Sequence, residues 1–100
     1  MYERNIILGF IRIHILHHAA EKTGIYGVEM IKELERHGYK ISPGTLYPIL
    51  HKMKKDKMLK TEKTNVNGKI RKIYRTTSKG EKTLKNLTIF VKELSQEVLK

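Results

Sequence analysis

The sequence contains no cysteine and no tryptophan, and only two phenylalanines and two prolines among its 100 residues. Without cysteine the chain has no disulfide, no thiol nucleophile and no thiolate ligand for a metal. No stretch approaches the ~18 consecutive apolar residues that a transmembrane helix requires. The low proline and glycine content excludes a collagen-like or Pro/Gly-rich disordered chain. With 39% hydrophobic residues, the chain can form one small globular core.

The N-terminus does not match a secretory signal peptide. Glu3 lies where a basic region would be required, Arg12 interrupts the apolar run, and residues 17–20 make a poor cleavage site. We therefore expect a cytoplasmic protein, which agrees with the lack of cysteine.

Positive charge is what the sequence has in excess. Lys and Arg number 21 against 10 Asp and Glu, so the net charge is +11. Such a charge destabilises the folded state by self-repulsion, which favours an anionic partner such as nucleic acid. The sequence has no glycine-rich phosphate loop, no nucleophile motif and no usefully spaced carboxylate pair. We therefore expect no enzyme, no catalytic residue and no cofactor.

Apolar periodicity predicts three helices in the first half of the chain. Residues 3–20 are apolar on so many sides that a helix there must be covered by other helices or by a second subunit. Residues 27–37 form an amphipathic helix that is followed by a terminating glycine. A third helix begins at Ser42-Pro43, a candidate cap followed by proline at the first helical position, and runs to about residue 56.

Pro48 leaves the start of this third helix open, because proline cannot donate a backbone hydrogen bond. Either the first turn from Pro43 is irregular, or the regular helix begins near Thr45. The sequence is compatible with both arrangements.

An Asn-Gly dipeptide predicts a two-residue type I′ turn between strands at 59–66 and 69–76. Like charges directly opposite each other destabilise a hairpin, so a hairpin that carries such pairs suits an anionic partner. Two such pairs are predicted by this turn, Lys60 with Arg75 and Lys63 with Lys72.

Residues 78–81 (Ser-Lys-Gly-Glu) predict a capping box at the start of a helix that continues to the C-terminus. Apolar residues follow at alternating spacings of three and four, the pattern of a coiled-coil seam. The seam could pack on the first helix of the same chain, but two unusually apolar helices in so short a chain favour a homodimer. The predicted dimerisation residues are Leu84, Leu87, Phe90, Val91, Leu94 and Val98.

The positive charge is concentrated in residues 42–75, where ten Lys and Arg minus one Asp and one Glu leave a net charge of +8. Two helices, a basic helix and a basic hairpin in this order predict a winged helix-turn-helix. In that fold the third helix enters the major groove of DNA and the hairpin reaches the adjacent backbone or minor groove. The expected fold class is mainly α with a small β-hairpin. Residues 1–77 would form the DNA-binding domain, and 78–100 a long dimerisation helix that packs with helix 3–20 as one structural unit.

Three stretches of the chain form recognisable motifs: Tyr-Gly-Val-Glu-Met-Ile at 26–31, Ile-Ser-Pro-Gly-Thr-Leu-Tyr-Pro-Ile-Leu at 41–50, and Arg-Lys-Ile-Tyr-Arg-Thr-Thr-Ser-Lys-Gly at 71–80. Together they resemble the PadR family of bacterial and archaeal transcriptional regulators, and the stretch at 42–48 is highly specific. The length is similar to the short subgroup, in which a single C-terminal helix replaces a larger dimerisation domain.

The resemblance implies a winged-helix homodimer that binds a pseudo-palindromic operator, usually as a repressor. In some members of the family a small molecule, such as a phenolic acid or a drug-like compound, releases the DNA. Two positions depart from the family pattern, which usually has an aromatic residue in place of Val28 and commonly glycine in place of Lys57. A non-glycine residue at 57 must adopt a positive φ or alter the exit of the third helix.

Helical periodicity and the resemblance together assign the DNA contacts. Residues near the start of a recognition helix meet bases and later ones meet phosphates, so we assign Thr45 and Tyr47 to bases or sugars. Tyr47 has an alternative role in packing against the hairpin, and for Tyr26 and Ser42 a turn or capping role is an alternative to phosphate contact. The predicted contacts are Ser42, Gly44, Thr45, Tyr47, His51, Lys52 and Lys55 on the recognition helix, Lys63, Lys69, Arg71 and Lys72 on the wing, and Tyr26 as a phosphate contact.

The histidines raise the question of a metal, because His14 and His18 lie one helical turn apart, with His17 beside them. Zinc typically requires three or four ligands, and no cysteine or well-placed carboxylate completes the set. His37 and His51 lie elsewhere in the sequence and look unrelated. We therefore expect no metal site.

The leading hypothesis is a homodimeric regulator that binds a double-stranded DNA operator, with an apolar effector cavity between the first and last helices at the dimer interface. The alternative is a basic winged-helix module that binds RNA or a protein partner without operator specificity. A membrane-surface role is not favoured, because the basic residues do not lie on one amphipathic helix with a lipid-facing side.

Overall fold

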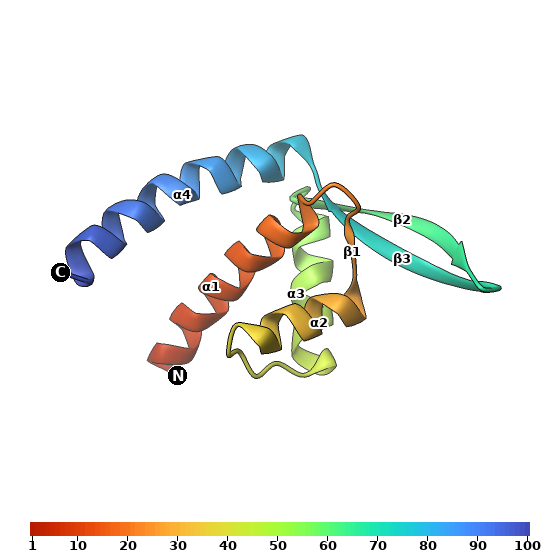
Figure 1. Cartoon of the computed structure of the whole chain (residues 1–100), viewed down its shortest axis with the longest axis horizontal. Coiled ribbons are helices and arrows are strands. Elements are labelled where there is room, and N and C mark those ends of the chain that lie inside the picture. The colour runs from red at the N-terminus through yellow and green to blue at the C-terminus, as the bar shows by residue number, and fades with distance from the viewer.

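The computed structural model describes every residue from Met1 to Lys100. The elements follow one another as α1 Tyr2–Ala19, β1 Ile25–Tyr26, α2 Gly27–Arg36, α3 Pro43–Lys55, β2 Leu59–Val66, β3 Lys69–Thr76 and α4 Ser78–Val98. In Figure 1 the first three helices form the body, the hairpin of β2 and β3 projects from one side, and α4 extends to the other side. This arrangement confirms the mainly α fold with a small sheet.

The hairpin has the predicted strands and register, since Lys60 pairs with Arg75 and Lys63 pairs with Lys72. Asn67 and Gly68 both have a positive φ, as a type I′ turn requires. The charge of Arg75, which lies opposite Lys60, is partly compensated, because its Nε lies 3.1 Å from the Oε1 oxygen of Glu62 on the partner strand. Strand β1, which has only two residues, was not predicted. It pairs with β3 and gives the sheet order β1-β3-β2.

A hydrophobic core fills the space between α1, α2, α3 and the base of the sheet. The last helix adds no large buried side chain to it, since Leu84 and Leu87 only pack against its edge and are half-buried. The body is therefore complete without the C-terminal half of α4. The buried core residues are Ile11, Ile15, Leu16, Ala19, Ile25, Met30, Leu34, Leu46, Ile49, Leu50, Met53, Leu59 and Tyr74.

Neither alternative that Pro48 left open for the start of α3 is correct. The helix begins at Pro43 with Ser42 at the N-cap position, and Pro48 lies inside it. The backbone N–H of Leu46 donates to the Ser42 carbonyl over 2.9 Å, so the first turn is helical. The Ser42 hydroxyl does not cap the helix backbone, and it donates instead to the Thr45 hydroxyl at 3.3 Å.

The end of α3 shows what replaces the expected glycine. Lys57 adopts a φ of 67°, which is the left-handed conformation that glycine would adopt at little cost. The chain therefore leaves α3 in the backbone conformation that glycine would adopt, at the cost of left-handed strain at Lys57.

The predicted capping box at 78–81 is wrong by one residue. Thr77 is the N-cap of α4, and its hydroxyl accepts a hydrogen bond from the Gly80 N–H at 3.0 Å. The Thr77 N–H also donates to the Met58 carbonyl at 3.0 Å. This bond to the residue before β2 fixes Thr77 at the junction, so Ser78 already lies inside the helix.

Candidate nucleic-acid interface

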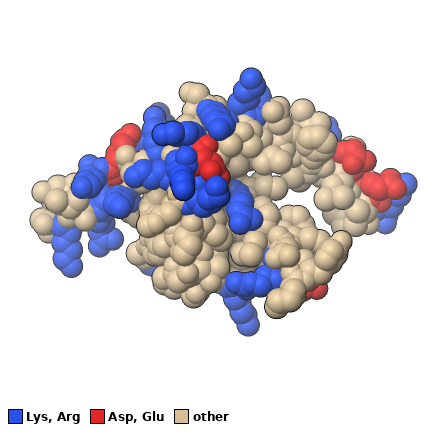
Figure 2. Space-filling model, turned by 180° about the vertical axis from the view of Figure 1, so that it is seen from behind, with Lys and Arg blue, Asp and Glu red and all other residues tan.

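The predicted DNA-binding residues lie on two neighbouring surfaces, the outer face of α3 and the hairpin. The inner face of α3 is occupied by core residues, which leaves the opposite face to solvent. On that side Gly44, His51, Lys52 and Lys55 are exposed, whereas Thr45 and Tyr47 are half-buried. All four predicted wing residues are exposed. Seen from behind, most of the Lys and Arg atoms gather on the half of the molecule that carries the hairpin (Figure 2).

A hollow of about 260 Å³ lies where the start of α2, the middle of α3 and strand β3 meet. It brings together residues that the sequence analysis had assigned separately to the recognition helix, the wing and a phosphate contact. Val28, one of the two departures from the family pattern, is 51% exposed at this place. The lining residues are Tyr26, Gly27, Val28, Tyr47, His51, Arg71, Lys72 and Tyr74.

Tyr47 fills the floor of this hollow by packing against Gly27. A Cβ atom at Gly27 would lie 2.5 Å from the Tyr47 hydroxyl, so only glycine allows this approach. Burial raises the pKa of the adjacent Tyr74 phenol, and the nearby Tyr47 adds to the shift. Tyr47 therefore packs against the start of α2, where the sequence had suggested packing against the hairpin, and it lies beside the cationic side chains of Arg71 and Lys72.

Arg71 of the wing contacts the start of α2, since its guanidinium carbon lies 5.9 Å from the centre of the Tyr26 ring. A cation over an aromatic face is attracted by the ring's quadrupole. The backbone N–H of Tyr26 donates to the Glu29 carboxylate at 2.9 Å, which fixes the start of α2 beneath this ring.

The basic residues of this surface differ in their partners. Lys52 donates to the Asp56 carboxylate at 2.9 Å, one turn along α3, and this pair weakens its field. Lys55 and the four predicted wing residues form no ion pair. The uncompensated charge is therefore greatest on the wing and at the end of α3.

The beginning of α3 lies away from this hollow. Ser42 and Thr45 line a second and larger hollow of about 850 Å³ against the N-terminal half of α1. The predicted contacts thus form two groups, one around Tyr47 and the wing and one at the first turn of α3.

Known proteins with similar sequences and structures identify the family of this chain. A model of the "Transcriptional regulator PadR-like family" matches residues 15–86, from the last turns of α1 into α4. The chain belongs to the PadR-like family. A PadR-like regulator of this kind is a DNA-binding transcriptional regulator rather than an enzyme.

Individual relatives agree with this assignment. The protein named Transcriptional regulator Rv3488 from Mycobacterium tuberculosis is 45% identical over 89 residues, which are 89% of this chain and 82% of that protein. The X-ray structure of a PadR-like transcription factor from Bacteroides fragilis is 30% identical, with a TM-score of 0.81 over 97% of this chain and 94% of that chain. A PadR-like transcriptional regulator from Bacillus cereus is 28% identical, with a TM-score of 0.86 over 94% of this chain and 92% of its own.

In this PadR-like regulator the apolar seam of α4 remains largely uncovered. Phe90, Leu94 and Val98 are 70%, 51% and 66% exposed. An apolar groove of about 620 Å³ is lined by Phe10 and Ile13 of α1 and by the seam residues Leu84, Val91, Leu94 and Val98, but not by Phe90. Figure 2 shows the hollow between the two helical arms, with few charged atoms along its edges. No helix of the chain has the length and apolar character needed to cross a membrane.

The expectation that His37 is unrelated to the N-terminal histidines is wrong. The ring of His37, at the end of α2, stacks on that of His14 with their centroids 4.8 Å apart. Burial lowers the pKa of His14 below its ordinary value of 6.5, and the neighbouring histidines, His37 foremost, add to the shift. Sequence spacing could not reveal the cluster, because it depends on how α1 crosses α2.

Proposed function

We propose that the chain is a homodimeric, sequence-specific regulator that represses transcription by binding a pseudo-palindromic operator. Residues 1–77 would form the DNA-binding domain and 78–100 the dimerisation helix. The observation that carries this proposal is the hollow that unites Tyr26, Tyr47 and His51 with Arg71 and Lys72 beside an unpaired basic wing. Hydroxyl, imidazole and guanidinium groups around one concave surface suit a phosphate of the DNA backbone.

We assign base recognition to the outer face of α3. Its first turn presents Thr45, and its last turn presents the unpaired Lys55. A recognition helix meets base edges with its first turns, while later residues hold the backbone. The tip of the wing would then place Lys69 at the neighbouring minor groove, with Lys63 and Lys72 alongside, while Arg71 contacts the adjacent phosphate.

The homodimer is supported by the seam of α4. A single chain leaves Leu94, Val98 and their neighbours in water although they form a continuous apolar row with α1. Contiguous exposed apolar patches mark interaction surfaces. A two-fold dimer covers the row and presents two α3 helices to half-sites ~34–36 Å apart. The groove between α1 and α4 would also hold a small apolar effector.

The primary test measures fluorescence anisotropy on the promoter upstream of the chain's own gene and on a shuffled duplex of equal length, at two salt concentrations. A preference of ~10³-fold or more for the promoter supports an operator. Tight binding to an RNA of equal length with no preference between the duplexes supports the alternative, a basic module without operator specificity. Negligible binding to every nucleic acid refutes both nucleic-acid functions.

Arg71→Ala is expected to weaken binding to the promoter and to the shuffled duplex by the same factor. A phosphate contact carries no sequence information, and its loss releases one counterion fewer. The slope of log K against log salt should therefore become shallower by about one. Lys85→Ala, which removes an exposed charge on α4 away from the interface, should leave the slope unchanged. An unaltered slope in the Arg71 variant contradicts its phosphate role.

Thr45→Ala should act differently, because a base contact contributes only on the right sequence. We expect a loss of ~1–3 kcal/mol on the promoter and almost none on the shuffled duplex. The same anisotropy titration measures both. Equal losses on both duplexes would assign Thr45 to the backbone instead.

A further inference from the structure

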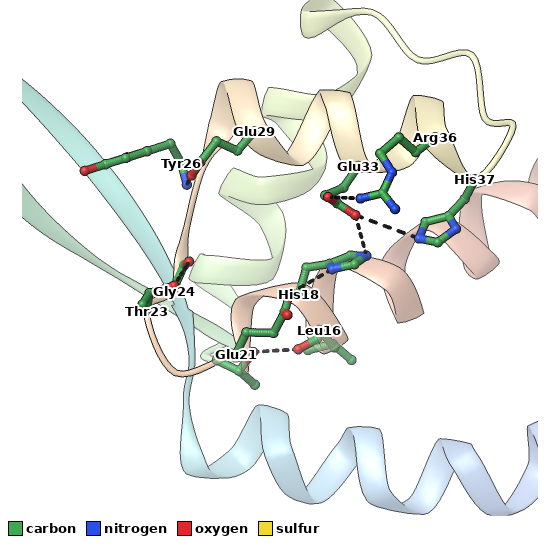
Figure 3. Close-up of polar contacts among 11 residues, drawn as sticks. Leu16, His18, Glu21, Thr23, Gly24, Tyr26, Glu29, Glu33, Arg36 and His37 are labelled. Atoms are coloured by element: carbon green, nitrogen blue, oxygen red, sulfur yellow. Dashed lines mark hydrogen bonds and ion pairs between the residues drawn. The ribbon is translucent and has the colours of Figure 1, made fainter.

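Three histidines lie together between α1 and α2, with the rings of His14, His18 and His37 stacked on one another. His14 and His18 come from the last turns of α1, and His37 is the residue that ends α2. One ring nitrogen of each lies within 4.8 Å of the others. Figure 3 shows His18 and His37 pointing from the two helices toward the same carboxylate, that of Glu33. None of the three histidines is among the predicted DNA contacts, and the cluster has no part in the proposed DNA binding.

His18 is held in the orientation of a metal ligand. Its Nδ1 lies 3.0 Å from an oxygen of Glu21, and this contact places the proton on Nδ1. The lone pair is then on Nε2, which is buried and has no hydrogen-bond partner. Buried polar atoms are rarely left unpaired, so this nitrogen is available to bind a ligand. A carboxylate behind one ring nitrogen with a metal on the other is the usual arrangement around metal-binding histidines.

Glu33 supplies the remaining donor. Its Oε2 oxygen lies 3.9 Å from Nε2 of both His18 and His37, beyond hydrogen-bond distance from either. Its other oxygen accepts a hydrogen bond from the Arg36 guanidinium at 2.8 Å, which directs Oε2 toward the histidines. The carboxylate therefore faces the cluster with an unshared oxygen.

We propose that His14, His18 and His37 bind one zinc ion, with Glu33 as the fourth ligand. Three imidazoles and one carboxylate oxygen are ligands that Zn²⁺ takes in a tetrahedron at ~2.0–2.2 Å. Tetrahedral ligands at this distance lie ~3.3 Å apart, so the ring nitrogens must approach one another by up to about 1.5 Å. The His37 side chain is 41% exposed and can turn to do so. Because the ligands come from α1 and α2, the ion would fix the first helix of the helix-turn-helix against α1.

The test is isothermal titration of Zn²⁺ into tag-free protein that has been stripped with a chelator. We expect one ion per chain with a Kd in the micromolar range or tighter, and a melting temperature that rises with zinc concentration. His37→Gln should weaken binding by about 100-fold or more, and Glu33→Gln by about 10- to 100-fold. His51→Gln removes an exposed histidine outside the cluster and should bind zinc as the wild type does.

His37 is a suitable position for the test because its side chain lies at the surface, so its replacement leaves the core intact. Far-UV circular dichroism of each variant confirms that it is folded. The proposal is overturned by a titration without heat and without a thermal shift. It is also overturned by zinc binding that survives in His37→Gln or that is lost equally in His51→Gln. None of these outcomes depends on whether the chain binds an operator.

Discussion

Leu94→Glu is expected to produce a folded monomer that has lost its preference for the operator. Leu94 lies in the middle of the exposed seam of α4 and is absent from the core, so a charge there leaves the body intact. In a dimer the same position would face its symmetry mate, and two carboxylates without partners would be buried. A monomer reads one half-site, so the affinity for the full promoter should fall by ~10³-fold, to the level of the shuffled duplex.

Analytical ultracentrifugation gives the mass, circular dichroism gives the fold, and the anisotropy titration gives the affinity. The matched control is Gln96→Glu, which adds the same charge at an exposed position two residues further on. Two residues rotate the helix by about 200°, so this charge faces away from the seam. Gln96→Glu should remain a dimer. If Leu94→Glu also keeps the mass of a dimer, the seam is not the interface.

The elements with strong local signals were predicted to within about a residue. The Asn-Gly turn defines the register of the hairpin by itself, because both of its residues need a positive φ and the strands follow with alternate faces. The helices α2 and α3 are marked by a glycine after one and by Ser42-Pro43 before the other. Such signals involve neighbours in sequence and need no knowledge of the fold.

Contacts between distant elements escaped prediction. The approach of Tyr47 to Gly27 and of His37 to His14 depends on the angles at which helices cross, which no local pattern encodes. Strand β1 is too short for an alternating pattern, and it forms only because β3 offers an unpaired edge. The cap of α4 was misplaced because Thr77 and Ser78 are both good caps, and only the bond to Met58 selects the first.

At the junction of β3 and α4, the addition of a single methyl group should have a large effect on the free energy of unfolding. Gly80 is buried in the first turn of α4, and a Cβ atom there would collide with the Met58 carbonyl oxygen and lie 2.6 Å from Cγ2 of Thr76. The Met58 carbonyl cannot move away easily, because it accepts a hydrogen bond from the Thr77 N–H, and the Thr77 hydroxyl donates to the neighbouring Lys57 carbonyl. Gly80→Ala must therefore break the cap or shift α4. We expect a loss of about 3 kcal/mol and a melting temperature lower by roughly 10–20 °C.

Gly44→Ala separates this collision from the general effect of replacing a helical glycine. The only neighbouring atom of a Cβ at Gly44 is the Ser42 hydroxyl oxygen, at the ordinary contact distance of 3.8 Å. Alanine is the better helix former, so the melting temperature of this variant should stay the same or rise by a few degrees. Scanning calorimetry at equal protein concentration compares the two, since the stability of a dimer depends on concentration. Equal shifts in both variants would show that α4 can move away from β2 without loss, and that Gly80 does not determine how the wing joins α4.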